Sequence, residues 1–239
     1  MTEALRSPAV ITDIFISERA QGAADVAAAA RARGLEVVWA GERVVAALSD
    51  AVTPQGVVAV ARSPLLELAA LPTGDLAVVL AEMRDPGNAG TLLRSAVAAG
   101  ASALIFTRGA VDPLNPKTVR AAAGSLFSIP LASGASLDDA VAHLRRGGLE
   151  ILGASSGAGP AHERDLTRPL ALVLGNEAWG LSREHRRLLD GLVGISMPGP
   201  AESLNVGIAG SILLYECMKQ RAIKMGNGDE GGRVREDQL

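Results

Sequence analysis

Polar residues that could bind a ligand follow an apolar run in LAVVLAEMRDPGNAGTLLRSAVAAG, residues 76–100. The sequence DPGN predicts a tight turn in which Pro86 fixes φ and Gly87 supplies a positive φ. We expect Asn88 to be the N-cap of the next helix and Arg94 to lie on its surface, away from the apolar stripe. The local pattern favours a plain capped helix, although α/β proteins also bind ligands at such a turn after a parallel strand.

A second turn follows the apolar run in LALVLGNEAWGLSREHRRLLD, residues 170–190. Gly175 has no side chain, so a ligand could approach the backbone closely there. Glu177 supplies an acidic group for a cationic or polyol ligand, whereas the alternative interpretation is an ordinary strand–turn–helix connection. The sequence GNEAWG is not a dinucleotide-binding fingerprint, because the spacing of its glycines is wrong for one.

A third polar group lies at the start of a helix in LVGISMPGPAESLNVGIAGSILLYECMKQR, residues 192–221. Ser203 is expected to be the N-cap, and the free backbone N–H groups at this helix end could receive a carboxylate or a carbonyl. Residues 206–215 are apolar nearly all round the helix, which predicts burial on most sides. Gly207 and Gly210 each cost about 1 kcal/mol relative to alanine, which suggests that another backbone passes close to them.

Apolar, β-branched runs alternate with helical patterns along the chain, and these elements must position the three segments. Strands are expected at residues 13–17, 36–39, 56–61, 76–82, 103–107, 150–155, 170–175 and 192–197, and helices at 23–33, 42–48, 89–99, 116–123, 136–146, 183–190 and 204–221. This alternation predicts an α/β fold with a mostly parallel sheet and helices on both faces. Residues 62–75, with two prolines and a glycine, indicate a linker after a small N-terminal domain.

The composition limits the class of protein. Of 239 residues, 48% are hydrophobic and 21% are charged, as in globular proteins. No apolar run has membrane-spanning length and the N-terminus lacks a signal-peptide pattern, so we expect a cytoplasmic protein with no membrane partner. Cys217 is the only cysteine and the histidines are far apart, so no disulfide and no metal site are expected. A net charge of −3 neither favours nor excludes nucleic acid, but 3% aromatic residues argue against the base-stacking platform of single-strand binders.

Taken together and in order, the three segments resemble the SpoU (TrmH-like) RNA ribose 2′-O-methyltransferases of the SPOUT superfamily, over about residues 76–221. The residues that match the three family motifs are Asp85, Pro86, Asn88 and Arg94, then Gly175, Glu177 and Gly180, and then Ile195, Met197, Glu202, Ser203, Leu204, Asn205 and Val206. Ser196 replaces the usual proline of the third motif, and Gly207 replaces a serine that is common after it. One motif would be a weak signal, whereas three in order at fitting separations are a strong one.

The resemblance implies a fold and a division into domains. It implies a SPOUT methyltransferase domain at residues 76–224 with a C-terminal deep trefoil knot. Residues 1–66 resemble the second half of the family's small α/β substrate-binding domain, so a domain truncated at its start is expected, with a linker at residues 67–75. A polar, disordered tail is expected at residues 225–239. The family acts as a homodimer with the site near the interface.

The resemblance also implies an enzyme that transfers a methyl group from S-adenosylmethionine to a ribose 2′-hydroxyl of RNA. The cofactor-binding residues would be Thr107, Leu174, Gly175, Asn176, Gly180, Ile195, Met197, Ser203 and Leu204. The family assigns removal of the hydroxyl proton to the arginine of the first motif, here Arg94. Because a guanidinium releases its proton only at high cost, two roles stay open: a base helped by a substrate phosphate, or a stabiliser of the developing alkoxide. Asn88, Glu177, Ser203 and Asn205 are expected to position Arg94, the ribose and the cofactor.

Three alternatives accompany this interpretation. Ribosomal RNA is favoured because the N-terminal segment resembles the domain common in that branch, but transfer RNA is the alternative substrate. A catalytically idle RNA-binding member of the fold is disfavoured by the intact Asn88, Arg94, Glu177 and Asn205. A nucleotide-dependent α/β oxidoreductase is disfavoured by the missing dinucleotide fingerprint.

Overall fold

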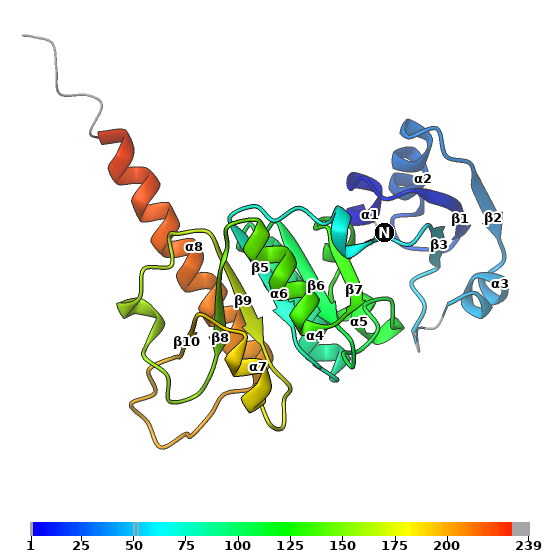
Figure 1. Ribbon diagram of the computed structural model, residues 1–239. Helices are drawn as coiled ribbons and strands as arrows, with labels where there is room; N and C mark the ends of the chain where they lie inside the picture. The colour runs from blue at the N-terminus through cyan, green and yellow to red at the C-terminus, as the bar shows by residue number, and fades with distance from the viewer. Residues whose placement is uncertain (1, 50, 52, 231–239) are drawn as a thin grey trace, which may run out of the picture. The chain divides into compact units, whose positions relative to one another are not determined.

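The computed structural model describes residues 2–49, 51 and 53–230, and the chain divides into two compact units (Figure 1). The first unit comprises Met1–Pro64 and Ala123–Ser128, and the second comprises Leu65–Ala122 and Ile129–Leu239. Each unit has a hydrophobic core of its own. The three polar segments identified in the sequence all belong to the second unit.

The first unit is built on a three-stranded sheet in the order β2-β1-β3. Its elements are α1 (Thr2–Arg6), β1 (Ile11–Ser17), α2 (Ala23–Ala32), β2 (Val37–Ala40), α3 (Glu42–Ala47), β3 (Val57–Ala61) and the 3-10 helix η2 (Ser125–Phe127). β1 runs parallel to β2 and antiparallel to β3. Ile14 and Ile16 of β1 share a core with Ala27 and Ala30, because the small side chains of α2 let this helix lie close to the sheet.

The second unit contains the seven-stranded sheet β10-β8-β9-β5-β6-β7-β4, in which every neighbouring pair is parallel. Its strands are β4 (Leu65–Leu66), β5 (Leu76–Leu80), β6 (Ala103–Thr107), β7 (Leu131–Ala135), β8 (Glu150–Ala154), β9 (Leu170–Leu174) and β10 (Gly191–Val193). Its helices are α4 (Pro86–Ala98), α5 (Pro116–Ala121), α6 (Leu137–Arg146), α7 (Arg183–Arg187) and α8 (Val206–Glu230), with the 3-10 helices η1 (Leu68–Ala70) and η3 (Ala161–Glu163). The predicted α/β fold with a mostly parallel sheet is confirmed.

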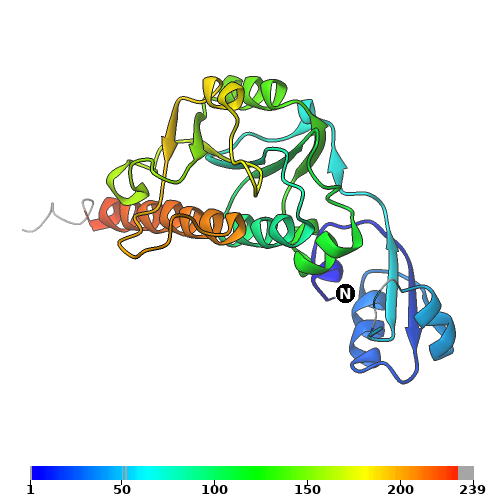
Figure 2. The same ribbon diagram turned by 90° about the horizontal axis from the view of Figure 1, so that it is seen from below.

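Helices cover both faces of this sheet (Figure 2). α6 and α7 lie on one face, while α4 and α8 lie on the other. Leu137, Val141 and Leu144 of α6 pack against a core that includes Val79 and Ile105. β5, β6 and β9 are buried along their whole length, which explains why their sequences are apolar throughout rather than alternating.

Two boundaries differ from those that the sequence predicts. Leu65–Leu66, expected at the end of the N-terminal domain, forms β4 beside β7, and Leu68–Ala70 within the expected linker forms η1. A strand of two residues is too short to show a periodic pattern. α8 continues to Glu230, past residue 225 where the disordered tail is expected, because an established helix gains one hydrogen bond for each added residue. Residues 231–239 of that tail lie outside the described residues.

The prediction that residues 206–215 are buried on most sides is confirmed only in part, because one side of α8 is exposed in the described chain. Ile208, Ile212 and Tyr215 are 53%, 41% and 58% exposed. An apolar sequence reveals that a surface avoids water but does not reveal which molecule covers it.

Cys217, also on α8, is buried, and this burial raises the pKa of its thiol to about 11, so little reactive thiolate forms near neutral pH. None of the described helices is both long enough and apolar enough to cross a membrane.

Candidate functional site

Two of the three segments meet at the carboxyl ends of neighbouring parallel strands. β5 pairs with β9, and Leu80 lies opposite Leu174, so the turns that follow these strands begin side by side. The third segment reaches the same place because α8 packs against α4. Gly210 of α8 lies against Leu92 of α4 and against Leu174 at the end of β9. Segments far apart in the sequence therefore converge at the edge of the sheet where α/β proteins bind ligands.

The turn after β9 closes as a tight hairpin. Asn176 and Gly180 exchange both backbone hydrogen bonds, at 3.1 and 2.9 Å, and the side-chain oxygen of Asn176 accepts another from the N–H of Ala178 at 2.9 Å. Gly180 has a φ of 65°, a conformation that favours glycine. A Cβ at Gly175 would lie 2.7 Å from the backbone nitrogen of Leu181. Glycine is therefore needed at this position because the backbone of the same turn passes close to it.

Glu177 fastens this hairpin to the loop before α4. Its two carboxylate oxygens accept hydrogen bonds from the backbone N–H groups of Arg84, at 3.2 Å, and Asp85, at 2.9 Å. The side-chain amide of Asn176 donates to the carbonyl of Glu82 at 2.8 Å. Glu177, which the sequence predicts to contact a ligand, thus accepts hydrogen bonds from the protein's own backbone and links the second motif to the first.

Thr107 holds the same loop from the end of β6. Its buried hydroxyl accepts a hydrogen bond of 3.0 Å from the N–H of Glu82. Glu82 has a φ of 53°, a left-handed conformation that is costly for a residue other than glycine and persists only where its surroundings hold it. Thr107 and Asn176 supply that hold by bonding the two sides of Glu82. Thr107 lies outside the pocket lining, although the resemblance includes it among the cofactor-binding residues.

The start of α4 differs from the prediction. Asp85, rather than Asn88, is the N-cap, because its carboxylate accepts a hydrogen bond of 2.7 Å from the backbone N–H of Asn88. Pro86 and Gly87 are the first helical residues, so Gly87 does not have the expected positive φ. Aspartate followed by proline suits a helix start as well as a turn, and here the helix prevails because the cap satisfies a free N–H group.

The start of α8 also differs from the prediction. Asn205, rather than Ser203, is the N-cap, since its side-chain oxygen accepts hydrogen bonds from the N–H groups of Gly207, at 2.9 Å, and Ile208, at 3.2 Å. Ser203 is exposed and lines the pocket. A Cβ at Gly207 would lie 3.0 Å from Oδ1 of Asn88, so this glycine brings the starts of α8 and α4 together.

Gly210 lets side chains, rather than a second backbone, approach α8. A Cβ at this position would overlap a methyl group of Leu92 and would lie 2.7 Å from one of Leu174. The expectation that another backbone passes close to this glycine is therefore wrong, because leucines of α4 and β9 fill the space. The hydroxyl groups of Ser95 on α4 and Ser211 on α8 share a hydrogen bond of 2.7 Å, which adds a polar contact between the two helices.

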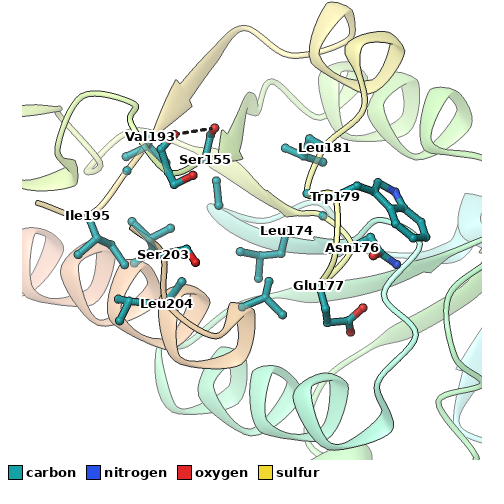
Figure 3. Close-up of a pocket in the computed structure, with 18 of the residues that line it drawn as sticks. Ser155, Leu174, Asn176, Glu177, Trp179, Leu181, Val193, Ile195, Ser203 and Leu204 are labelled. Atoms are coloured by element: carbon teal, nitrogen blue, oxygen red, sulfur yellow. Dashed lines mark hydrogen bonds between the residues drawn. The ribbon is translucent and has the colours of Figure 1, made fainter. Parts of the chain in front are cut away.

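Residues of the second and third segments, together with residues 154–156 at the end of β8, line a pocket of about 330 Å³ (Figure 3). All the expected cofactor-binding residues except Thr107 line it, namely Leu174, Gly175, Asn176, Gly180, Ile195, Met197, Ser203 and Leu204. Figure 3 shows Ile195 and Leu204 toward one end of the pocket and Glu177 and Trp179 toward the other. The pocket thus has an apolar end beside α8 and an end beside the loop before α4.

Other lining residues carry no motif signal in the sequence. Ser155, Trp179 and Arg186 line the pocket, and Nη2 of Arg186 donates to the hydroxyl of Ser155 at 3.3 Å. Of these, Trp179 offers a clue in the sequence, since it is one of only two tryptophans in the chain. Among the described residues, no group of three or more His, Cys, Asp or Glu side chains could hold a metal ion.

Three of the expected catalytic residues lie outside the pocket lining. Asn88 and Asn205 lie close to Gly207, where α4 and α8 begin. Arg94 is exposed on α4, and its guanidinium has no hydrogen bond or ion pair within the described part of the chain. Its charge is therefore free to meet a bound molecule.

Comparison with known proteins identifies similar chains. The sequence model of the SpoU rRNA methylase family matches residues 75–215, and a model described as RNA 2′-O ribose methyltransferase substrate binding matches residues 1–65. The chain is 32% identical over 214 residues to the 23S rRNA (guanosine(2553)-2′-O)-methyltransferase RlmP of Bacillus subtilis (strain 168), with 89% of this chain and 83% of the relative covered. It is 39% identical over 176 residues to the 23S rRNA (uridine(2479)-2′-O)-methyltransferase of Streptomyces viridochromogenes, with 70% of this chain and 61% of that relative covered.

Solved structures are similar over most of the chain. The SpoU methyltransferase AviRb from Streptomyces viridochromogenes has a TM-score of 0.81 at 31% identity, with 93% of this chain and 87% of that chain covered. An AdoMet-bound rRNA methyltransferase from Sinorhizobium meliloti has a TM-score of 0.78 at 33% identity, with 91% and 83% covered. The complex of AviRb with AdoMet has a TM-score of 0.79 at 31% identity, with 92% and 87% covered.

Proposed function

The chain belongs to the SpoU rRNA methylase family, and we propose that it is an S-adenosylmethionine-dependent methyltransferase that acts on a ribose 2′-hydroxyl of ribosomal RNA. The pocket carries this proposal, because residues that match the second and third family motifs line it together. Relatives named as 23S rRNA 2′-O-methyltransferases support ribosomal RNA as the substrate class. The AdoMet-bound structures of similar chains support S-adenosylmethionine as the cofactor.

The pocket fits such a cofactor in size and in character. Its volume of about 330 Å³ lies within the range of small-molecule sites. Leu174, Ile195 and Leu204 offer apolar walls to an adenine ring, and the hydroxyl of Ser203 and the backbone near Gly175 offer polar contacts. When bound, the cofactor supplies a methyl group on a positively charged sulfur. The residues of this chain hold it in place beside the RNA.

Arg94 is the residue that we propose for the ribose hydroxyl. Its guanidinium is exposed and unpaired within the described residues. Two roles are open to it: a base helped by a substrate phosphate, or a stabiliser of the developing alkoxide. Asn88 and Asn205 lie at the adjoining starts of α4 and α8, and Glu177 in the turn after β9 bonds to the loop before α4. These residues position the helix that carries Arg94 and the cofactor pocket beside it. Ser203, which lines the pocket, contacts the cofactor.

We also propose the deep trefoil knot that the family resemblance implies. Three hydrogen bonds support a C-terminal segment threaded through the loop after β8. Gly194 donates to the carbonyl of Gly159 at 2.8 Å and accepts from the N–H of Ala161 at 2.9 Å. From α8, Gln220 then donates to the carbonyl of Ala161 at 3.2 Å. The loop is thus bonded both to the chain before α8 and to α8 itself.

Three further features complete the proposal. Residues 1–66 select the RNA, which the substrate-binding match to residues 1–65 supports. The enzyme is a homodimer, which the exposed apolar side chains of Ile208, Ile212 and Tyr215 on α8 support. A ribosomal RNA substrate supports action in the cytoplasm.

A methyl-transfer assay tests the proposed function. The protein is incubated with labelled S-adenosylmethionine and separate fractions of 23S rRNA, 16S rRNA and tRNA, and the modified nucleotide is mapped. We expect label on a ribose 2′-oxygen of ribosomal RNA, whereas label on tRNA alone would establish the alternative substrate. Calorimetric titrations with S-adenosylmethionine, NAD and ATP are expected to show binding of the first only. If S-adenosylmethionine does not bind, the proposed function is wrong.

A further inference from the structure

Trp179 is a large aromatic side chain that stays in contact with water at the pocket. It is 52% exposed although it lines the pocket. Burial of an indole ring is strongly favourable, so a half-exposed ring at a concave site is typical of a surface that a ligand covers. Its neighbours Ala178 and Gly180 leave the ring without steric cover from the same turn.

Contacts with Arg84 and hydrogen bonds within the turn restrain the position of the ring. The Cζ atom of Arg84 lies over the ring, 5.4 Å from its centroid, which is the geometry of a cation–π contact. Glu177 accepts a hydrogen bond from the N–H of Arg84, and Asn176 pairs twice with Gly180, so both partners of the contact sit on bonded backbone. A ring with this support loses little conformational freedom when a ligand binds to it.

The position of the ring separates it from the apolar end of the pocket. Trp179 lies toward the end opposite Ile195 and Leu204, close to Glu177 and the loop before α4 (Figure 3). α4 carries Arg94, the proposed partner of the ribose hydroxyl. We take this end of the pocket as the side of the RNA substrate, because the loop beside Trp179 leads into the helix that carries Arg94.

We propose that Trp179 stacks on the base of the RNA nucleotide that is methylated, and that Arg84 acts as a positioning residue that orients the ring and adds positive charge beside the RNA backbone. This inference rests on the proposed function. Unstacked bases of RNA commonly bind aromatic rings and guanidinium planes, and this pair presents one of each. Stacking on Trp179 would fix the base and thereby hold its ribose at the pocket.

The kinetics of the full chain with a 23S rRNA transcript test the stacking. Trp179→Leu keeps apolar volume but removes the aromatic face, so we expect the KM for RNA to rise about tenfold. Trp179→Phe is the matched control, because it retains a ring and is expected to recover most of the lost RNA affinity. The Kd for S-adenosylmethionine, measured by calorimetry, is expected to stay within about twofold of wild type. Arg84→Gln is expected to give a smaller rise in the KM for RNA.

Fluorescence gives a second readout that needs no methyl transfer. The chain has two tryptophans, so Trp39→Phe leaves Trp179 as the only one. We expect the 23S rRNA transcript to quench this emission and S-adenosylmethionine alone to leave it nearly unchanged. Quenching by S-adenosylmethionine, or a weaker Kd for it in Trp179→Leu with an unchanged KM for RNA, would overturn the proposal, because the ring would then cover the cofactor. An active wild type with an unaffected Trp179→Leu variant would overturn it too. A wild-type protein that neither binds S-adenosylmethionine nor methylates RNA would instead contradict the proposed function itself.

Discussion

At the residue scale, the polar side chains of the site divide into those that fasten the backbone and those that are free. Glu177, Asn176 and Thr107 each bond to the loop between β5 and α4. Arg94 is exposed and has no partner within the described residues. The first group should therefore affect stability and cofactor binding together, whereas Arg94 should affect the reaction alone.

Glu177→Gln tests the fastening role. A carboxylate offers an acceptor to each of the two N–H groups of Arg84 and Asp85, whereas an amide has only one acceptor oxygen. One N–H group then loses its partner, so we expect the free energy of unfolding to fall by about 1 kcal/mol, given the exposure of the site. Urea unfolding measures this loss, and calorimetry is expected to show weaker S-adenosylmethionine binding. An unchanged midpoint and Kd would show that the two bonds contribute nothing.

Arg94→Lys tests the reacting group. The lysine keeps the positive charge but loses the planar fork of donors, so we expect kcat to fall at least about tenfold with both substrates saturating. Because Arg94 is exposed, the free energy of unfolding should stay within about 0.5 kcal/mol of wild type. Arg187→Lys, at an exposed arginine of α7 outside the pocket lining, is the matched control. A near-normal rate for Arg94→Lys would contradict both roles that rely on the guanidinium.

At the element scale, the packing of α8 on α4 and β9 brings the third motif to the first two. This packing depends on glycines, because both helices approach each other where a side chain would intrude. At Gly210 the nearest groups are methyl groups of Leu92 and Leu174, which are buried and closely packed. At Gly207 the nearest groups are the side-chain oxygens of Asn88 and Asn205, at 3.0 and 3.1 Å.

Gly210→Ala and Gly207→Ala form a matched pair. Alanine gains about 1 kcal/mol of helix propensity at either position. At Gly210 the new methyl group overpacks the leucines at a cost of about 1–3 kcal/mol, so we expect a net loss of up to about 2 kcal/mol in the free energy of unfolding. At Gly207 the polar neighbours need to shift only slightly, so the small steric cost and the gain in helix propensity nearly cancel, and stability changes little. Denaturant unfolding of both variants measures the difference, and equal stabilities would refute the packing argument.

At the scale of the whole molecule, the exposed apolar side chains of α8 call for a partner surface. Ile208, Ile212 and Tyr215 recur on one side of the helix at spacings of four and three residues. Such a stripe on an exposed helix is typical of a protein–protein interface. In a homodimer the stripe of each copy would supply an apolar surface for the other.

Ile212→Glu tests the homodimer. Wild type should sediment as a dimer of the 24.5 kDa chain at micromolar concentration, whereas an unpaired carboxylate in an apolar interface should leave a monomer. Ala142→Glu, at an exposed position on α6, is the control and should remain dimeric. A wild-type monomer at micromolar concentration, or a dimer of Ile212→Glu, would contradict the proposed interface.

Much of the fold could be predicted from the sequence because burial imposes local patterns. β5, β6 and β9 read as strands because both of their faces are covered, and the amphipathic α6 reads as a helix. β4 and β7 could not be predicted, since one has two residues and the sequence of the other, LASGA, contains little β-branched character. Both lie at the β4–β7 edge of the sheet, where burial dictates less of the sequence.

By itself, the sequence determined the alternation of strands and helices, the order of the three motifs and hence the family and its cofactor. Only the tertiary structure decided what each polar residue does. Glu177 and Arg84 are 93 positions apart in the chain, and no local pattern reveals that they bond. The structure likewise made Asp85 and Asn205 the helix caps and placed Trp179 under Arg84. The physical reason is that hydrophobic periodicity records burial along one element, whereas hydrogen bonds and ring contacts depend on which elements the folded sheet brings together.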